Sequence, residues 1–457
     1  MFIDMNTNEI INYKKFKNLI NKNITNNGAL LFNSGKEISW VLIGQVISFI
    51  GKIIGIKLIT NYLNADLYGK FSLGLSIASF ISQSTGGFAQ ATLRYFNDYR
   101  EKGEVSKQIF VLIKILSIIS SIMIAFTVVI VLILNVLNYD KWNIIVVISL
   151  LIGILGVGNE IIGRVYDSIR KRFLSSVNIV FRSWIPYLVT IFLINFIKVS
   201  DVVALGGYLL GTLLVFISQS VVFVKTFRNE VENGFIYSRD IFERYINYAL
   251  PFLYWGIPSW FQSYGDRWII NGLLDTRSVG LYAILVQIGG APIIFLSTIL
   301  NKYISPIVYD QVEEGNQKIN RNHLVKWLVI DISIFISILS FFVVVLFLFH
   351  RNIIVILSST YYSEISFMLP WISIGIGAME IGRHLAMIGF FYDKPNVYIV
   401  PKVGIVVLVL ILNFIFINIW GIIGAVYSLI LSGFVFLVWN GLIGYRLLKP
   451  EEVKGFK

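Results

Sequence analysis

Cysteine is absent from this sequence, and histidine occurs only three times in 457 residues. A chain without cysteine forms no disulfides and offers no thiolate as a nucleophile or metal ligand. The three histidines, His323, His350 and His384, are too widely spaced to indicate a zinc site. We therefore expect neither a bound metal ion nor a cofactor.

Charge is also scarce, because only 14% of the residues are charged and 56% are apolar, with a mean hydropathy of +0.76. A soluble protein of this size needs more charge to cover its surface. Apolar runs of roughly 20 residues recur along the chain, which is the length of helix that crosses a bilayer. A barrel would alternate with a period of two, whereas Ile122–Leu134 is apolar except for Thr127. The sequence predicts an all-α multi-pass membrane protein.

Twelve transmembrane helices are expected, six in each half of the chain. Their approximate ranges are 37–60, 70–95, 108–136, 142–164, 175–197, 202–226, 244–273, 279–301, 324–349, 363–391, 396–418 and 421–446. The corresponding units are a cytoplasmic N-terminal tail (1–36), an N-lobe (37–226), a cytoplasmic linker (227–243), a C-lobe (244–446) and a cytoplasmic C-terminal tail (447–457).

The two halves contain related segments. Ile59–Phe71 and Ile270–Tyr282 both lead from an apolar helix through a polar turn to a glycine, Gly69 or Gly280, two residues before an aromatic residue. The matching positions lie 211 residues apart. Six helices per half give both halves the same orientation in the membrane, so the repeats are parallel. We expect two parallel six-helix lobes around a central cavity.

Lysine and arginine are concentrated in alternate connecting segments. With the N-terminus placed inside, the cytoplasmic segments and helix edges hold 27 of them and the outer loops hold five. Positive residues favour the cytoplasmic side of a membrane, so both termini are predicted to be cytoplasmic. This distribution explains most of the formal charge of +12 without a nucleic-acid partner.

Cations within the spans outnumber acidic residues at similar depth, which favours an anionic ligand. Lys52 is the leading candidate, because Gln45, Ser48 and Lys52 share one face of the first span. Either this stripe lines the cavity, or Lys52 extends to the outer interface. The other candidate binding cations are Lys57, Arg94 and Arg182, each with a similar interfacial alternative, and Arg267, whose alternative is a structural ion pair near the outer surface.

Acidic residues within the spans suggest coupling groups or ion pairs. Asp266 and Arg267 are neighbours and point in different directions from one helix, so one of them could contact substrate while the other pairs across the lobes. Glu380, Arg383 and His384 lie near one face of the tenth span. They form either a salt bridge beside water or a group that couples transport to protons or ions.

Several segments, taken in order, resemble the Wzx-type polysaccharide and O-antigen flippases of the multidrug/oligosaccharidyl-lipid/polysaccharide exporter superfamily. These segments are Leu58–Phe71, Ala91–Phe96, Asp266–Ile270, Val279–Tyr282 and Trp420–Ala425. The resemblance implies twelve helices, two parallel lobes and a V-shaped cavity. It also implies a flippase that moves undecaprenyl-pyrophosphate-linked oligosaccharides from the inner to the outer leaflet of a bacterial inner membrane, by alternating access.

In that reading the partners are the lipid-linked oligosaccharide, membrane lipids, Na⁺ or H⁺ as a coupling ion, and polysaccharide polymerase machinery. Tyr254, Trp255, Trp260 and Tyr264 are candidate surfaces on which sugars would stack. The alternative is an ion-coupled, drug-type exporter of small molecules. The short outer loops argue against a membrane enzyme such as a polymerase. The product could be an O antigen of lipopolysaccharide, a capsule or another surface polymer.

Overall fold

The computed structural model describes residues 39–232, 234, 236–309, 321–392 and 394–449. Within these ranges the chain forms twelve long helices, which confirms the predicted all-α fold. The predicted tail 1–36 and most of the predicted tail 447–457 lie outside the described residues.

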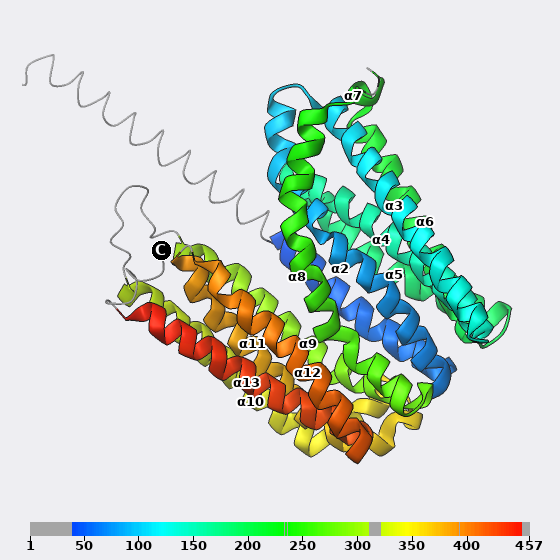
Figure 1. Cartoon of the computed structure of the whole chain (residues 1–457), viewed down its shortest axis with the longest axis vertical. Helices are drawn as coiled ribbons and strands as arrows, with labels where there is room; N and C mark the ends of the chain where they lie inside the picture. Colours follow the sequence, from blue (N-terminus) through cyan, green and yellow to red (C-terminus); the bar gives the residue numbers. More distant parts are fainter. Residues whose placement is uncertain (1–38, 233, 235, 310–320, 393, 450–457) are drawn as a thin grey trace, which may run out of the picture.

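The helices form two bundles of six (Figure 1). The first bundle contains the first helix Ser39–Tyr62, α2 (Ala65–Glu101), α3 (Val105–Val136), α4 (Asn143–Ser168), α5 (Arg172–Phe196) and α6 (Asp201–Thr226). The short helix α7 (Arg228–Glu232) follows. The second bundle contains α8 (Arg239–Leu273), α9 (Thr276–Tyr309), α10 (Arg321–Leu357), α11 (Leu369–Phe391), α12 (Ile399–Trp420) and α13 (Ile422–Leu448). Three 3₁₀ segments, Asp140–Trp142, Thr360–Met368 and Pro395–Tyr398, precede α4, α11 and α12.

Local sequence sets where several helices begin. The side chains of Asn64, Ser200 and Ser238 accept hydrogen bonds from the backbone N–H groups of the first turns of α2, α6 and α8. Such caps satisfy donors that have no partner inside the helix. Between α12 and α13, Gly421 has a φ of +61°, a conformation that favours glycine and lets the chain reverse within one residue.

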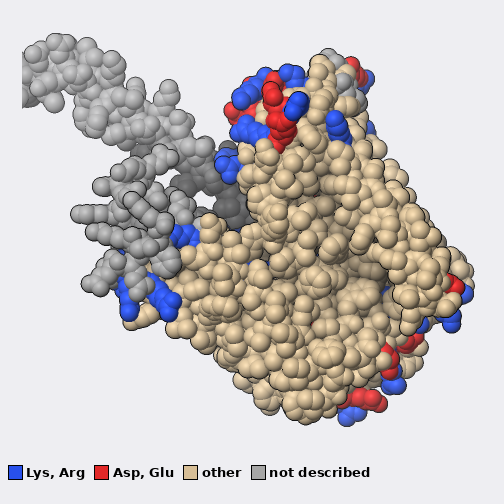
Figure 2. Space-filling model, in the orientation of Figure 1, with Lys and Arg blue, Asp and Glu red and all other residues tan. Residues whose placement is uncertain are grey.

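The outer surface fits a bilayer. Ten of the described helices are long and apolar enough to cross a membrane, and Figure 2 shows charged side chains near the ends of the molecule with a broad uncharged belt between them. α2 and α8 are also long enough to cross a membrane. They are more polar than the other ten long helices, because they lie where the two bundles meet rather than in lipid. The chain is a multi-pass membrane protein.

α2 and α8 are in backbone contact at the interface between the bundles. A Cβ atom on Gly256 would lie 2.2 Å from the Gln83 carbonyl oxygen, and one on Gly87 would lie 2.5 Å from the Ala249 carbonyl oxygen. Small residues allow such close helix contacts in membranes. α8 continues through Pro251 and Pro258.

The glycines of the repeated segment meet at one end of the molecule, which we call the closed end. A Cβ atom on Gly69 would lie 1.8 Å from the Thr276 carbonyl oxygen, and one on Gly280 would lie 1.8 Å from the Ala65 carbonyl oxygen. The first turns of α2 and α9 therefore cross backbone to backbone. From this crossing the other helices of the second bundle diverge from the first bundle toward the opposite, open end, where α7 and the C-terminal end of α13 lie (Figure 1). The N-terminal half of α8 stays against α2 and α3.

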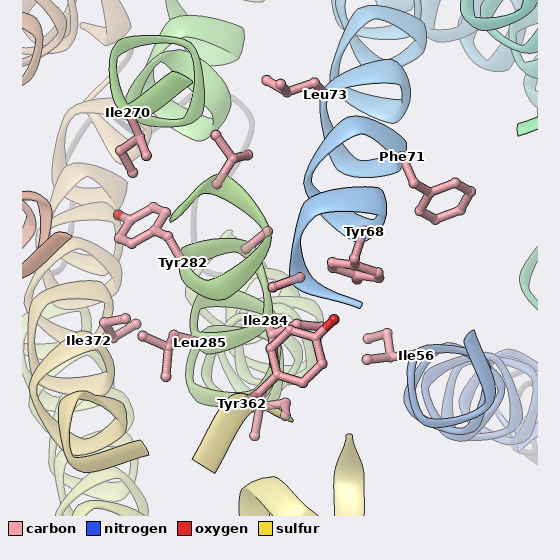
Figure 3. Close-up of a cluster of buried hydrophobic side chains, with 14 of the residues drawn as sticks. Ile56, Tyr68, Phe71, Leu73, Ile270, Tyr282, Ile284, Leu285, Tyr362 and Ile372 are labelled. Atoms are coloured by element: carbon pink, nitrogen blue, oxygen red, sulfur yellow. The ribbon is translucent and has the colours of Figure 1, made fainter. Parts of the chain in front are cut away.

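A continuous apolar core surrounds the crossing and joins the two bundles. Tyr68, Phe71, Tyr282 and Tyr362 are almost completely buried within it (Figure 3). The Tyr362 hydroxyl donates to the Leu63 carbonyl oxygen at 3.2 Å, which ties the segment before α11 to the first bundle. Burial of these large side chains joins the two bundles at the closed end.

Candidate functional site

A cavity of about 810 Å³ lies within the first bundle, with α8 and α9 forming its wall toward the second bundle. This volume suits a small ligand or the headgroup of a larger one. Its polar lining consists of Gln45, Ser48, Lys52, Tyr68, Ser72, Ser79, Ser82, Arg182, Ser183, Tyr187, Tyr208, Thr212, Tyr264, Arg267, Gln287 and Thr298.

Two cations face the cavity from neighbouring helices. Lys52 is on the first helix, where the predicted stripe of Gln45, Ser48 and Lys52 lines the cavity as a unit. Arg182 is on α5, close enough to Lys52 for the two positive charges to repel each other. Glu160 lies near Arg182 but is not part of the lining, and it is also 3.7 Å from Arg164. Lys52 therefore has a cationic neighbour rather than a carboxylate partner.

Arg267 reaches the cavity from α8. Its Nη1 donates to the Ser72 hydroxyl at 2.9 Å, and its guanidinium carbon lies 4.8 Å from the centre of the Tyr264 ring. The side chain is 6% exposed, and its Nε atom has no hydrogen-bond partner among the described residues. These contacts hold the guanidinium in place while leaving donor capacity for a ligand.

The electrostatics of the cavity favour an anion. Among the described residues that line it, three are cationic and none is aspartate or glutamate. Positive charge inside a membrane is costly unless it is paired or hydrated, and like charges brought together add to that cost. A bound anion would remove both costs at once, and guanidinium groups suit phosphate oxygens particularly well.

Aromatic side chains form much of the rest of the wall. Tyr187 on α5 and Tyr208 on α6 are in edge contact, with ring centres 5.5 Å apart. Of the aromatic residues that sequence analysis singled out on α8, Tyr264 lines the cavity, while Tyr254 is 78% exposed and is not part of the lining. Sequence analysis missed Tyr187 and Tyr208, because no motif marks them and only helix packing brings them together.

Two other predicted binding cations, Lys57 and Arg94, lie outside the cavity lining. Lys57 donates through Nζ to the carbonyl oxygens of Val355, at 2.8 Å, and Ser358, so it caps the end of α10 in the other bundle. Arg94 is exposed and lies 5.2 Å from the centre of the Tyr248 ring.

Asp266 points away from the cavity, as its position beside Arg267 allows. Its Oδ1 accepts the Arg267 backbone N–H at 2.8 Å, and its carboxylate interacts with the Tyr282 hydroxyl. It is not part of the cavity lining. Arg267 therefore both lines the cavity and contacts the other bundle through Ser72, whereas Asp266 contacts Tyr282 of its own bundle. The proposed division of roles between the two residues stays a prediction.

The remaining candidates form a second polar cluster inside the second bundle. Glu380 accepts from Arg383, and also from the Ser297 hydroxyl at 2.8 Å. His384 contacts the Ser297 oxygen through Nε2 at 3.0 Å and the Asp331 carboxylate through Nδ1. Asp331 is fully buried. Ser297 carried no sequence signal.

Solved transporter structures share the overall fold. The inward-facing conformation of a multidrug resistance MATE family transporter of the MOP superfamily has a TM-score of 0.67 and 14% identity, over 90% of this chain and 96% of that one. The outward-facing conformation of such a transporter gives 0.58 at 15% identity, with the same coverage.

A MOP superfamily transporter from Pyrococcus furiosus, described as having a binding pocket of reverse polarity that suggests a different function, gives a TM-score of 0.55 at 14% identity. The match covers 90% of this chain and 95% of that one. At these identities the likeness shows the fold.

A search of curated proteins found no match. The model of the family described as "Polysaccharide biosynthesis protein" matches residues 34–310, which include the whole described first bundle and the cavity wall formed by α8 and α9. Because this match covers more than half of the sequence, the chain belongs to the polysaccharide biosynthesis protein family, and it has the fold of MOP superfamily transporters.

Proposed function

We propose that this protein is a flippase that moves undecaprenyl-pyrophosphate-linked oligosaccharide repeat units from the inner to the outer leaflet of the bacterial inner membrane. The observation that carries the proposal is the cavity with Lys52, Arg182 and Arg267 and no lining carboxylate among the described residues. Family membership supports a role in polysaccharide export. No covalent bond is made or broken, so the protein acts as a transporter and not as an enzyme.

The three cations would bind the pyrophosphate of the substrate. Arg182 and Arg267 offer guanidinium forks that match phosphate oxygens, while Lys52 adds a mobile point charge. The first sugars would lie against Tyr187 and Tyr208, whose rings provide flat apolar surfaces with polar edges. The prenyl chain would remain in lipid, because burying it in a polar cavity would gain nothing.

The orientation of the chain supports uptake from the cytoplasmic side. The segments 94–107 and 164–172, which hold four lysines or arginines each, lie at the open end, and such segments favour the cytoplasm. Both termini would then be cytoplasmic. The structure corresponds to the state that receives substrate, and rocking of the bundles would expose the cavity to the other side.

Reconstituted transport of a prenyl-pyrophosphate-linked oligosaccharide tests this proposal. Wild-type protein in liposomes should move the labelled lipid between leaflets, measured by its accessibility to a glycan-cleaving enzyme added outside. Lys52→Ala and Arg182→Ala should reduce the rate at least about tenfold, as expected for loss of a charge-assisted contact. Lys114→Ala is the matched control, since Lys114 is a cation within a span that lies outside the cavity lining.

The alternative is an ion-coupled exporter of small molecules. The solved structure with a TM-score of 0.67, described as a multidrug resistance transporter, favours this class by fold. The cationic cavity would then select anionic compounds rather than cationic drugs. Export of a soluble anion with no movement of the lipid-linked oligosaccharide would establish this alternative and exclude the flippase. The same assay run with Na⁺ or H⁺ gradients would identify the coupling ion.

Two finer assignments belong to the same proposal. The exported polymer would be an O antigen, a capsule or another surface polysaccharide, and a polymerase would receive the flipped units. Build-up of prenyl-linked oligosaccharide in a deletion strain, relieved by wild type and not by Lys52→Ala, would support both assignments in cells. Normal surface polysaccharide in the deletion strain would exclude them.

A further inference from the structure

The second polar cluster has no place in the binding of substrate. It consists of Ser297, Asp331, Glu380, Arg383 and His384, and none of these residues lines the cavity. Asp331 and His384 have no exposed surface, and Ser297 and Glu380 are at most 3% exposed. Burying ionisable groups together inside a membrane protein is costly, and it is typically associated with a function.

The hydrogen bonds of the cluster determine where its protons are. Ser297 has one hydroxyl hydrogen, which it donates to Glu380 Oε2 at 2.8 Å. The contact of 3.0 Å between the Ser297 oxygen and His384 Nε2 therefore needs a hydrogen on Nε2. On the other side of the ring, Nδ1 faces the Asp331 carboxylate, which only accepts, so Nδ1 also carries a hydrogen.

We infer that His384, held between Asp331 and Ser297, is a proton-binding site, and that its occupancy controls which end of the transporter is open. With Asp331 ionised, the hydrogen-bond pattern fits the doubly protonated imidazolium in the conformation described. Proton binding neutralises the buried Asp331 charge, whereas loss of the proton would leave that carboxylate unpaired in an apolar environment. The role of this site in transport rests on the proposed function. Proton binding and its effect on the conformation can be tested without it.

Ser297 provides a route for the proton. His384 Nε2 would pass its hydrogen to the Ser297 oxygen while the Ser297 hydrogen moves to Glu380 Oε2, which leaves a neutral imidazole and a protonated Glu380. Water beside Arg383, whose side chain is 41% exposed, then accepts the proton from Glu380, and the ionised Glu380 again pairs with Arg383. The two transfers inside the cluster each move one hydrogen along an existing hydrogen bond, and water is the final acceptor.

Charged groups on the neighbouring helices face the outer part of this route rather than His384. Lys402 on α12 interacts with Arg383 and Glu380 and donates to Gln262 of α8 at 2.7 Å. On α13 the nearby polar group is neutral, since Asn440 donates to the Gly382 carbonyl oxygen at 3.0 Å.

Other charged groups on α9 and α10 lie nearer the open end. Lys302 on α9 interacts with Asp167 and Arg172 of the first bundle, and Lys326 on α10 is exposed. Among the described groups, Asp331 is therefore the one charge that directly contacts the His384 ring. We expect it to determine the affinity of that ring for a proton.

α9 connects the proton site to the cavity. Ser297 faces the cluster, while Phe295 and Thr298 on the same turn line the cavity, and Phe295 stacks on Phe49 of the first helix at 4.5 Å between ring centres. A change in the Ser297 hydrogen bonds therefore acts on the helix that forms the boundary between the bundles. Protonation of His384 should favour the conformation described here, in which the bundles are apart at the open end. Deprotonation of His384 should favour the conformation that opens at the opposite end.

A sodium site fits the same groups less well. Hard cations bind several oxygen ligands that are free to face the ion. Here both Glu380 carboxylate oxygens and Asp331 Oδ2 are hydrogen-bonded to Arg383, Ser297 and His384, which leaves Asp331 Oδ1 as the single carboxylate oxygen of the cluster without a partner among the described residues. The arrangement pairs acceptors with N–H and O–H donors, which is the chemistry of proton binding.

Nitrogen NMR of His384 tests proton binding directly. In the full chain carrying His323→Gln and His350→Gln, His384 is the remaining histidine. We expect ¹⁵N shifts of a doubly protonated ring near neutral pH, with a titration that moves to lower pH by at least one unit in Asp331→Asn. A neutral ring from pH 5.5 to 8.5, or no change in Asp331→Asn, would overturn the inference.

Electron spin resonance tests the coupling to conformation. Labels on Lys102→Cys and Asn396→Cys report the separation of the bundles at the open end, since the chain has no other cysteine. In liposomes without substrate, the ratio of open to closed populations should fall about tenfold or more between pH 5.5 and 8.5. His384→Gln and Glu380→Gln should abolish that dependence.

His350→Gln is the matched control, since His350 contacts Ser366 and not the cluster, and its pH dependence should equal that of the wild type. Exchange of Na⁺ for K⁺ at constant pH should have no effect. A response to Na⁺ with none to pH would overturn the inference, as would a pH response retained in His384→Gln. These outcomes do not depend on which substrate the protein carries.

Discussion

Two lysines of the first helix show how depth and direction decide the role of a residue. Lys52 projects into the cavity near Arg182. Lys57, little more than one turn later, donates to carbonyl oxygens at the end of α10. Those carbonyl groups lack partners within their helix and carry partial negative charge. The polar stripe in the sequence identified Lys52, but nothing in the sequence revealed that Lys57 connects the two bundles.

Replacing these two lysines in the same way should separate the roles. Lys57→Met removes the cap on α10 and should destabilise the protein by about 1–3 kcal/mol, the usual effect of leaving buried acceptors without a partner. Lys52→Met removes a cation from repulsive surroundings and should leave stability equal to or above that of the wild type. Thermal unfolding in detergent measures both. Equal losses in the two variants would contradict the assignment.

Arg267 should respond to a conservative substitution differently from Lys52. Its guanidinium donates to Ser72 and lies over Tyr264, and lysine cannot reproduce both contacts. We expect Arg267→Lys to lower transport of the lipid-linked oligosaccharide about tenfold or more, while Lys52→Arg should retain at least half of the wild-type rate. Initial rates in liposomes at matched protein density give the comparison, and full activity of Arg267→Lys would refute the prediction.

At the scale of the helix, the crossing of α2 and α9 determines the geometry of the closed end. The first turns of the two helices approach so closely that a side chain on either glycine would overlap a carbonyl oxygen. Tyr68 adds a hydrogen bond to Gln287 at 3.0 Å beside the crossing. The repeated Gly-x-aromatic segment is therefore a packing motif, used once by each half of the chain.

Gly69→Ala should be severely destabilising. Its new methyl group would lie 1.8 Å from the Thr276 carbonyl oxygen, and such overlap in a packed interior typically costs about 1–3 kcal/mol or more. Gly86→Ala on the same helix is the control, since a Cβ atom there meets nothing within 4 Å. Thermal unfolding should separate the two variants, and a Gly69→Ala protein as stable as Gly86→Ala would show that the crossing is loose.

The helices could be predicted from sequence because the thickness of the bilayer sets their length. The observed helix ends differ from the predicted ones, because polar helix ends extend beyond the hydrocarbon. For example, the span predicted at 70–95 is the helix Ala65–Glu101. The cluster of Ser297, Asp331 and His384 could not be assembled from spacing. Those residues come from three helices, and only packing reveals which faces meet.

At the scale of the whole molecule, the conformational state is defined by the side of the membrane from which the cavity can be reached. Ser79 lines the cavity, Lys102 lies at the open end, and Lys198 is exposed at the opposite end of the first bundle. Because the chain contains no cysteine, a single cysteine at each position reports accessibility without background.

An impermeant maleimide added from one side of oriented vesicles tests access. Reagent on the cytoplasmic side should label Ser79→Cys and Lys102→Cys, and reagent on the outer side should label Lys198→Cys alone. The expected difference follows from the opening of the bundles at one end. Labelling of Ser79→Cys chiefly from the outer side would show that the other state predominates in membranes.

The backbone crossing of Gly69 and Gly280 also makes each bundle a lever. α2 contains 37 residues, so it extends about 55 Å from the fulcrum at its first turn. A rotation of about 10° there would move its far end by about 10 Å, by the same helix geometry. A shift of less than an ångström at the glycine crossing, where no side chain lies between the two backbones, therefore produces a much larger displacement at the other face of the membrane. That displacement is as wide as a sugar ring and its hydration shell.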